Sequence, residues 1–206
     1  MKIFLHGFAT TPEIWPEGGP RLSFDDLEKT AEGLGSRLGP GNILIGWSMG
    51  GMVAMMVAAK YPEKVAKLVL VSTTTKFVAS PDFPHGLSPA LLRSLRKRIK
   101  KEGIKAFHSL VFKNMSRVGL ADLTTEQAER ELAELEKVDL RPWLKDIRVP
   151  TLIIHGEKDD ICLPSAAQYL NDKIEGSELV MLSGVGHAPM VEAPEVFNSL
   201  LKNYAG

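Results

Sequence analysis

Cysteine is almost absent from this sequence, and so are long hydrophobic runs and an excess of either charge. The single cysteine, Cys162, excludes an intrachain disulfide and a zinc site built from cysteines, which fits a reducing compartment. No uncharged apolar stretch reaches the roughly 18 residues that a membrane-spanning helix needs, and the apolar run at the N-terminus is too short for the core of a signal peptide. We therefore expect a cytoplasmic protein with no membrane partner.

Charge and length narrow the class further. Lys and Arg total 25, as do Asp and Glu, so no overall field attracts nucleic acid, and a charged partner must meet a local patch. With 206 residues and 44% apolar content, the chain is long enough for one sizeable core and short for two. The sequence predicts one domain, residues 1–206, and leaves monomer and homodimer open.

Short apolar runs alternate with helical patterns along most of the chain. The predicted strands are Ile3–Leu5, Ile43–Ile45, Leu68–Val71, Thr151–Ile154 and Glu178–Leu182. The predicted helices between them include Phe24–Leu38, Gly50–Lys60 and Ser165–Ile174. This alternation predicts an α/β fold with a mostly parallel sheet and helices on both faces. Such sheets gather their chemistry at the carboxyl ends of the strands.

Residues 77–146 break this rhythm, because they contain no convincing strand. A basic helix is predicted over 88–103, with an apolar stripe of Leu91, Leu92, Leu95 and Ile99. An acidic helix begins at Thr124 or Thr125 and continues through Leu135. We interpret 77–146 as a helical lid inserted within the single domain.

Ser48 lies in a Gly-x-Ser-x-Gly motif between a predicted strand and a predicted helix, the context of a nucleophile elbow. Glycines at 46 and 50 relieve the collisions that a side chain would cause in such a turn. The helix N-terminus favours developing negative charge. We predict that Ser48 is a nucleophile; the alternative is that it only caps the helix.

A serine hydroxyl needs a base, and that base needs an orienting group. Of the five histidines, His187 alone combines a glycine-rich loop, a position after the last predicted strand and the chain order Ser, acid, His. His6 and His155 each precede a glycine after a strand, and His85 and His108 lie in the insertion. We therefore predict His187 as the base.

The acid should follow the strand that precedes His187 in the chain. That strand leads into a loop that carries Glu157, Asp159 and Asp160. Asp159 is the first choice, and the other two stay open as alternatives. A carboxylate could also follow the strand that ends at Val71, but Ser72 and three threonines occupy that place.

An acyl-transfer site also needs two backbone N–H donors for the oxyanion. One is expected from Met49, directly after the nucleophile. The other is expected from Phe8, in the glycine turn after the first strand.

Four motifs occur along the chain in the order HGF, GWSMGG, HGEKD and GHAP. In this the sequence resembles the α/β-hydrolase superfamily over nearly its whole length. Within the superfamily it most resembles the pimeloyl-acyl-carrier-protein methyl ester esterases of biotin synthesis. That closer resemblance rests on Trp47 before the nucleophile, on the stretch 138–141 and on His187-Ala188-Pro189.

The resemblance implies a serine carboxylesterase that removes the methyl ester from a pimeloyl chain on a phosphopantetheine arm, with no metal or organic cofactor. Ser48, Asp159 and His187 would be the triad, and the Phe8 and Met49 N–H groups the oxyanion hole. The family match also implies substrate contacts at Phe8, Ser48, Met49, Phe107, His108, Ser109, Leu110, Val111 and His187.

Two other functions stay open. One is a general short-chain carboxylesterase or lactonase that uses the same triad. The other is a non-catalytic binding protein on the same fold, against which the complete Ser, Asp and His set argues. A haloalkane dehalogenase is disfavoured, because its nucleophile would be a carboxylate.

The carrier protein of that family is acidic, and the chain holds a basic cluster that suits it. Residues 93–105 contain seven Lys and Arg against one acid, Glu102. Such a cluster raises the encounter rate with an acidic partner. The expected carrier contacts are Arg93, Arg96, Lys97, Lys101 and Lys105. The alternative is a solvated helix face that pairs with the acidic helix 126–136.

The chain departs from the family at its front, because only 47 residues precede Ser48 and 12–24 contains no clear strand. This predicts a smaller sheet with an exposed edge and a more open active site, or pairing with another chain. Phe8 also stands where similar family members carry tryptophan, and the acid loop, 159–164, is longer than usual.

Overall fold

Five strands form one parallel sheet in the computed structural model, which describes residues 1–112 and 119–206. They are β1 (Lys2–Leu5), β2 (Asn42–Trp47), β3 (Val65–Val71), β4 (Thr151–Gly156) and β5 (Glu178–Leu182). Neighbouring strands are parallel throughout, and their order in the sheet is their order in the chain. The prediction of a mostly parallel α/β sheet is confirmed, and each predicted strand is present.

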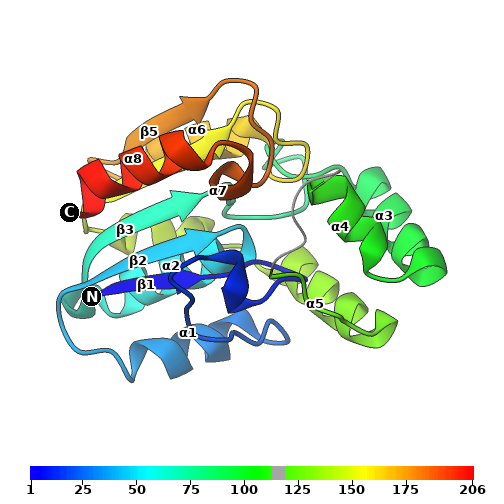
Figure 1. Cartoon of the computed structure of the whole chain (residues 1–206), viewed down its shortest axis with the longest axis horizontal. Coiled ribbons are helices and arrows are strands. Elements are labelled where there is room, and N and C mark those ends of the chain that lie inside the picture. Colours follow the sequence, from blue (N-terminus) through cyan, green and yellow to red (C-terminus); the bar gives the residue numbers. More distant parts are fainter. Residues whose placement is uncertain (113–118) are drawn as a thin grey trace.

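Helices cover both faces of the sheet (Figure 1). They are α1 (Leu27–Gly35), α2 (Met49–Lys60), α3 (Pro89–Glu102), α4 (Lys105–Phe112), α5 (Thr125–Lys137), α6 (Pro164–Lys173), α7 (Pro189–Glu192) and α8 (Pro194–Ala205). Short 3-10 turns occupy Pro12–Ile14, Pro62–Lys64 and Arg141–Asp146. Within the described ranges, no helix is long and apolar enough to cross a membrane.

The helix α1 is shorter than its predicted span of 24–38. Asp26 stands at its N-cap, and its side chain accepts a hydrogen bond from the Lys29 N–H at 3.0 Å. Because an N-cap side chain satisfies a free amide of the first turn, it sets the point at which the helix begins. Hydrophobic periodicity alone did not locate this cap.

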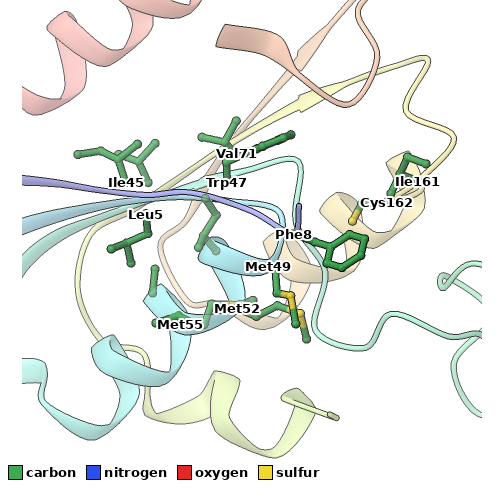
Figure 2. Close-up of a cluster of buried hydrophobic side chains, with 14 of the residues drawn as sticks. Leu5, Phe8, Ile45, Trp47, Met49, Met52, Met55, Val71, Ile161 and Cys162 are labelled. Carbon is green, nitrogen blue, oxygen red and sulfur yellow. The ribbon is translucent and has the colours of Figure 1, made fainter. Parts of the chain in front are cut away.

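The helix α2 is the centre of the core. It packs against β1, β2 and β3 on one side and against α1 and the 141–146 turn on the other. Its residues from Met49 through Ala58 are therefore buried all around, with no polar face. Figure 2 shows Leu5 pointing toward the helix face that carries Met52 and Met55, and Ile45 and Val71 pointing to the opposite side of the sheet.

The helices α3, α4 and α5 lie beyond the carboxyl ends of the strands (Figure 1), where a lid would lie. Leu92, Leu95 and Ile99 of the predicted stripe on α3 are buried, whereas Leu91 at its start is 57% exposed. The separate helix α4 was not predicted as an element. Residues 113–118 of the 77–146 insertion lie outside the described residues.

The free edge of β1 is covered by the chain's own segment 12–24, which contains no strand. Trp15 packs its ring on Phe4, with centroids 5.3 Å apart. Gly19 comes so close that an added Cβ would stand 2.1 Å from the Phe4 carbonyl oxygen. The expectation of an exposed edge is therefore wrong at Phe4, because a loop occupies the place where another strand would pair.

Replacing Gly19 with alanine tests this cover. The added Cβ would force the loop away from Phe4, so we expect the free energy of unfolding to fall by about 1–3 kcal/mol. Because the β1 edge would then be open, self-association should also rise. Urea unfolding and size-exclusion chromatography measure the two effects.

The matched control is Gly33→Ala. Gly33 lies inside α1 with open space around its Cβ position, so alanine should stabilise the protein by about 0.5–1 kcal/mol through helix propensity. Equal stability of Gly19→Ala and the wild type would contradict the proposed role of the loop.

Candidate active site

Ser48 stands at the turn between β2 and α2 in a conformation that few residues adopt. Its φ is +54° and its ψ is −121°, a backbone strain of about 1–3 kcal/mol for a residue other than glycine. The neighbouring backbone fixes it: the Ser48 N–H donates to the Val71 carbonyl at 2.9 Å, and the Thr73 hydroxyl donates to the Ser48 carbonyl at 2.7 Å. The side chain makes no capping hydrogen bond to α2, so the plain N-cap alternative does not describe it.

Two glycines of the motif make this turn possible. An added Cβ at Gly46 would stand 2.5 Å from the Gly50 carbonyl oxygen, and one at Gly50 would stand 2.3 Å from the His6 carbonyl oxygen. Real side chains do not tolerate such distances to backbone atoms. The turn therefore brings the start of α2 directly against the end of β1, as the motif predicts.

The Ser48 hydroxyl, the His187 ring and the Asp159 carboxylate form one hydrogen-bonded chain. His187 Nε2 lies 3.0 Å from Ser48 Oγ, and His187 Nδ1 lies 2.8 Å from Asp159 Oδ2. His187 and Asp159 are 4% and 1% exposed. Of the three candidate acids, the structure places Asp159 on the histidine, whereas Glu157 and Asp160 are exposed to solvent.

The Asp159 carboxylate is held in its charged form by four donors. Asp159 Oδ1 accepts the N–H groups of Ile161 at 2.9 Å and Cys162 at 3.0 Å, and Oδ2 faces both His187 and His155. Burial alone raises the pKa of this carboxyl, but the imidazole rings of His187 and His155 together hold it well below its usual range. Asp159 is therefore an anion that can orient His187 and stabilise its protonated form.

The loop that carries His187 is held from both sides. Glu192 in α7 accepts the Gly186 N–H at 2.8 Å on one oxygen and the Ala188 N–H at 3.0 Å on the other. The Trp47 indole N–H donates to the His187 carbonyl at 2.7 Å. These contacts fix the backbone on either side of the ring, so the glycine-rich loop is not free to carry His187 away from Ser48.

The two predicted oxyanion donors stand beside Ser48 and are uncommitted. Among the described residues, neither the Phe8 N–H nor the Met49 N–H donates a hydrogen bond. An added Cβ at Gly7 would come within 3.1 Å of Ser48 Cβ, so the loop after β1 packs directly on Ser48. The Phe8 and Met49 side chains are both buried (Figure 2).

The Gly7 carbonyl fixes the direction of the Phe8 N–H. It accepts the Thr10 hydroxyl at 2.8 Å and lies 3.1 Å from His6 Nδ1. His6 Nε2 accepts the Leu22 N–H at 3.0 Å, so the proton of the ring is on Nδ1. Burial lowers the pKa of His6 to about 4, which keeps this arrangement at neutral pH. Because the Gly7–Phe8 peptide is trans, its N–H points away from these contacts.

The 77–146 insertion contributes side chains to both ends of the site. Phe107 packs edge-on against Phe8 with ring centroids 4.8 Å apart, and His108 Nε2 lies 2.8 Å from the Ala9 carbonyl oxygen. Leu110 and Val111 line a small cavity of about 70 Å³ that His187 also lines. Ser109 of the same predicted segment is exposed.

Residues 119–121 of the insertion also contact the loop after β1. Thr10 and Leu120 form an antiparallel bridge, and the Ala121 N–H donates to the Ala9 carbonyl at 3.0 Å. Ala9 itself has a φ of +56°. The insertion therefore contacts the loop that carries Phe8 at two places, through His108 and through residues 119–121.

A larger cavity of about 360 Å³ lies between α3 and the acid loop. Most of its walls are apolar, and Ser94, Arg98 and Asp160 are its polar lining. It shares Leu110, Asp160 and Ile161 with the small cavity at His187. The two cavities therefore border one another, and the smaller one is lined by His187.

The basic residues of α3 and the start of α4 divide into two groups. Arg96 pairs with Glu129 at 3.6 Å and Glu136 at 3.0 Å on α5, and Arg98 pairs with Glu102 at 3.7 Å. Arg96 therefore pairs with the acidic helix α5, which was the alternative to a contact with the carrier. Five exposed cations form no salt bridge with any residue that the structure describes: Arg93, Lys97, Lys100, Lys101 and Lys105.

Several parts of the site gave no signal in the sequence. The clamp of Glu192 and the clasp of 119–121 come from tertiary contacts that no motif marks. Cys162, whose thiol faces Ser48 and whose pKa is raised by burial, is likewise visible only in the fold. No group of three or more His, Cys, Asp or Glu side chains within the described residues could hold a metal ion.

Comparison with known proteins gives the same architecture. Residues 16–200 match the alpha/beta hydrolase family. The chain is 33% identical over 193 residues to the pimeloyl-[acyl-carrier protein] methyl ester esterase of Neisseria meningitidis strain H44/76, which covers 87% of this chain and 74% of the relative. It is 31% identical to the enzyme of the same name from Nitrosomonas europaea, over 96% and 92% of the two chains.

The fold also matches a solved esterase from Exiguobacterium antarcticum. The TM-score is 0.85 at 22% identity, over 98% of this chain and 90% of the esterase. At this identity the likeness shows the fold alone.

Replacing Glu192 with glutamine tests the clamp on the His187 loop. Glutamine keeps the size but offers one amide oxygen, and its NH₂ group would face a backbone N–H. Since a hydrogen bond to a charged group contributes about 1.5–3 kcal/mol, we expect a fluorophosphonate to label Ser48 about tenfold more slowly. Glu195→Gln in the first turn of α8 is the control, and equal labelling rates of the two variants would contradict the clamp.

Proposed function

Since this chain belongs to the alpha/beta hydrolase family and is a carboxylic ester hydrolase, we propose that it cleaves the methyl ester of a pimeloyl chain carried on acyl-carrier protein, in biotin synthesis. The observation that carries the proposal is the hydrogen-bonded chain from Ser48 through His187 to Asp159 at a nucleophile elbow. Its relatives of that name supply the substrate class.

In the first step Ser48 Oγ attacks the ester carbonyl carbon while His187 Nε2 takes its proton. The carbonyl oxygen becomes an oxyanion that accepts the Phe8 and Met49 N–H groups, each of which contributes about 2.7–4 kcal/mol to such a transition state. Asp159 stabilises the imidazolium. The intermediate then collapses, and methanol leaves with the proton from His187, so that an acyl group remains on Ser48.

In the second step water replaces methanol. His187 Nε2 takes one proton from the water as its oxygen attacks the acyl carbon, and the same two N–H groups hold the new oxyanion. Collapse returns the proton to Ser48 Oγ and releases a free carboxylic acid. No metal or organic cofactor takes part in the proposed steps.

The apolar cavity beside α3 supports a substrate with a long methylene chain. It borders the small cavity at His187, and Leu91 and Leu110 on its lining are 57% and 39% exposed. Such exposed apolar side chains around a hollow are typical of a ligand groove. We therefore assign the pimeloyl chain and its arm to this cavity, beneath the basic residues of α3.

The five unpaired cations support an acidic carrier as the partner. They lie on α3 and at the start of α4, next to the cavity to which Arg98 also contributes. A positive patch of this kind steers an acidic protein and fixes its orientation. Because Arg96 pairs with α5, the proposed contact consists of Arg93, Lys97, Lys101 and Lys105 together with Lys100.

A general short-chain carboxylesterase or lactonase is the second candidate. It would use the same triad, and a preference for free short esters would favour it. A non-catalytic binding protein would leave Ser48 unlabelled by a fluorophosphonate. The uncommitted Phe8 and Met49 N–H groups argue against this last possibility.

Ser48→Ala tests the chemistry. The variant lacks the attacking oxygen, so ester hydrolysis should fall about ten-thousandfold or more. Circular dichroism should show an unchanged fold. Ser165→Ala, on the exposed surface of α6, is the control and should keep full activity. A folded Ser48→Ala protein that hydrolyses the ester at the normal rate would exclude the mechanism.

Charge reversal on α3 tests the partner. The double variant Lys97→Glu, Lys101→Glu should lose about tenfold or more in kcat/KM on pimeloyl methyl ester bound to the carrier, and nothing on free dimethyl pimelate. Since salt shortens the screening length to about 3 Å at 1 M, high salt should abolish the difference.

The control for this experiment is Arg148→Glu, Lys202→Glu, which changes the net charge equally on a surface outside α3 and α4. It should behave as the wild type on both substrates. Equal losses in the two double variants, or an enzyme that treats the carrier-bound and free esters alike, would favour the general esterase.

A further inference from the structure

Asp159 lies between two imidazole rings. His187 Nδ1 approaches Asp159 Oδ2 at 2.8 Å, and His155 Nε2 approaches the same oxygen at 3.3 Å. His155 is on β4, four residues before Asp159, and its side chain is completely buried. The proposed mechanism uses the first ring and gives no role to the second.

The contacts of His155 define which nitrogen carries its proton. Nε2 lies 2.7 Å from the Cys162 carbonyl oxygen and 3.3 Å from Asp159 Oδ2, so both neighbours of this nitrogen are acceptors. Nδ1 has no hydrogen-bond partner among the described residues. A proton on Nδ1 would have no acceptor and would leave a lone pair on Nε2 facing two oxygens. The proton is therefore on Nε2, and the ring donates to both oxygens.

We propose that His155 is a positioning residue for the acid of the triad, an inference that rests on the proposed function. Its shared Nε2–H ties the Cys162 carbonyl and the Asp159 carboxylate to the rigid end of β4. Asp159 is thereby fixed with Oδ1 on the loop amides and Oδ2 toward His187. The Asp159 carboxylate and the Cys162 carbonyl both belong to the acid loop, so the single His155 ring holds the loop at two points.

The second consequence is electrostatic. A donor on Oδ2 disperses part of the negative charge that would otherwise act on His187 alone. The titratable groups that face Asp159 are His155 from β4, His187 from the loop after β5, and the Cys162 thiol. With His155 in place, the carboxylate orients His187 without holding its proton too tightly, and the ring can return the proton to the leaving group.

Two replacements separate this role from packing. His155→Leu fills the space without a donor, whereas the side-chain amide of His155→Gln can reach the position of Nε2 and donate. We expect His155→Leu to lose about tenfold in kcat, with KM little changed, and the acid limb of its kcat/KM profile to move upward by about half a pH unit or more. His155→Gln should restore most of both. His85→Leu, in an aromatic cluster with Phe83 and Tyr169, is the control.

The same test can be made without turnover. In a Ser48→Ala background, NMR can follow the ring titration of His187 with and without His155→Leu, and its midpoint should move to higher pH when the donor is lost. If the wild type hydrolyses no ester, the proposed function fails while this titration still tests His155.

Three results would overturn the proposal. One is an unchanged titration midpoint in folded His155→Leu. Another is a pH profile that is lowered evenly without moving. The third is equal behaviour of the leucine and glutamine variants. Thermal unfolding identifies a variant that fails to fold. If His155→Leu does not fold, His155→Gln decides alone, because the proposal requires its His187 titration midpoint to equal that of the wild type.

Discussion

The strained backbone of Ser48 is the constraint on which the rest of the site depends. A positive φ at a serine persists only where surrounding contacts fix it, and here the contacts come from three directions. The end of β3 receives the Ser48 N–H, Thr73 holds its carbonyl, and the end of β1 presses on the start of α2 at Gly50. The packing of the core therefore stabilises the fold and also fixes the position of the Ser48 hydroxyl.

The groups around the Ser48 hydroxyl are held mainly by hydrogen bonds to backbone atoms and by buried charged side chains. Asp159 is held by two loop amides, and the His187 loop is clamped by Glu192 and Trp47. Such preorganisation lets the dipoles act on developing charge without rearranging during the reaction. The 77–146 insertion supplies much of the lining of the apolar cavity and the exposed cations, to which we assign the proposed substrate and its carrier.

The sequence predicted the elements of the sheet and brought forward Ser48, Asp159 and His187, because each lies at a strand end where local pattern and chain order agree. It favoured Asp159 but left Glu157 and Asp160 open, since contact with His187 depends on how the loop turns. The stripe on α3 did not reveal that Leu91 is exposed, because periodicity shows which face is apolar but does not show that a cavity interrupts the packing. Arg96 illustrates the same limit, since its partners lie on another helix. The role of 12–24 as a cover for β1 was also invisible, because it rests on the close approach of Gly19 to one carbonyl.

The sequential order of the strands has a consequence for how the molecule assembles. As the chain leaves the ribosome, each new strand can add to the edge that the previous one has just formed, without insertion between strands already paired. The strained serine turn is complete once β3 has paired with β2. The acid arrives only after β4, and the base only after β5. The residues that shape the serine turn are therefore encoded early in the chain, whereas the acid and the base follow in its last third.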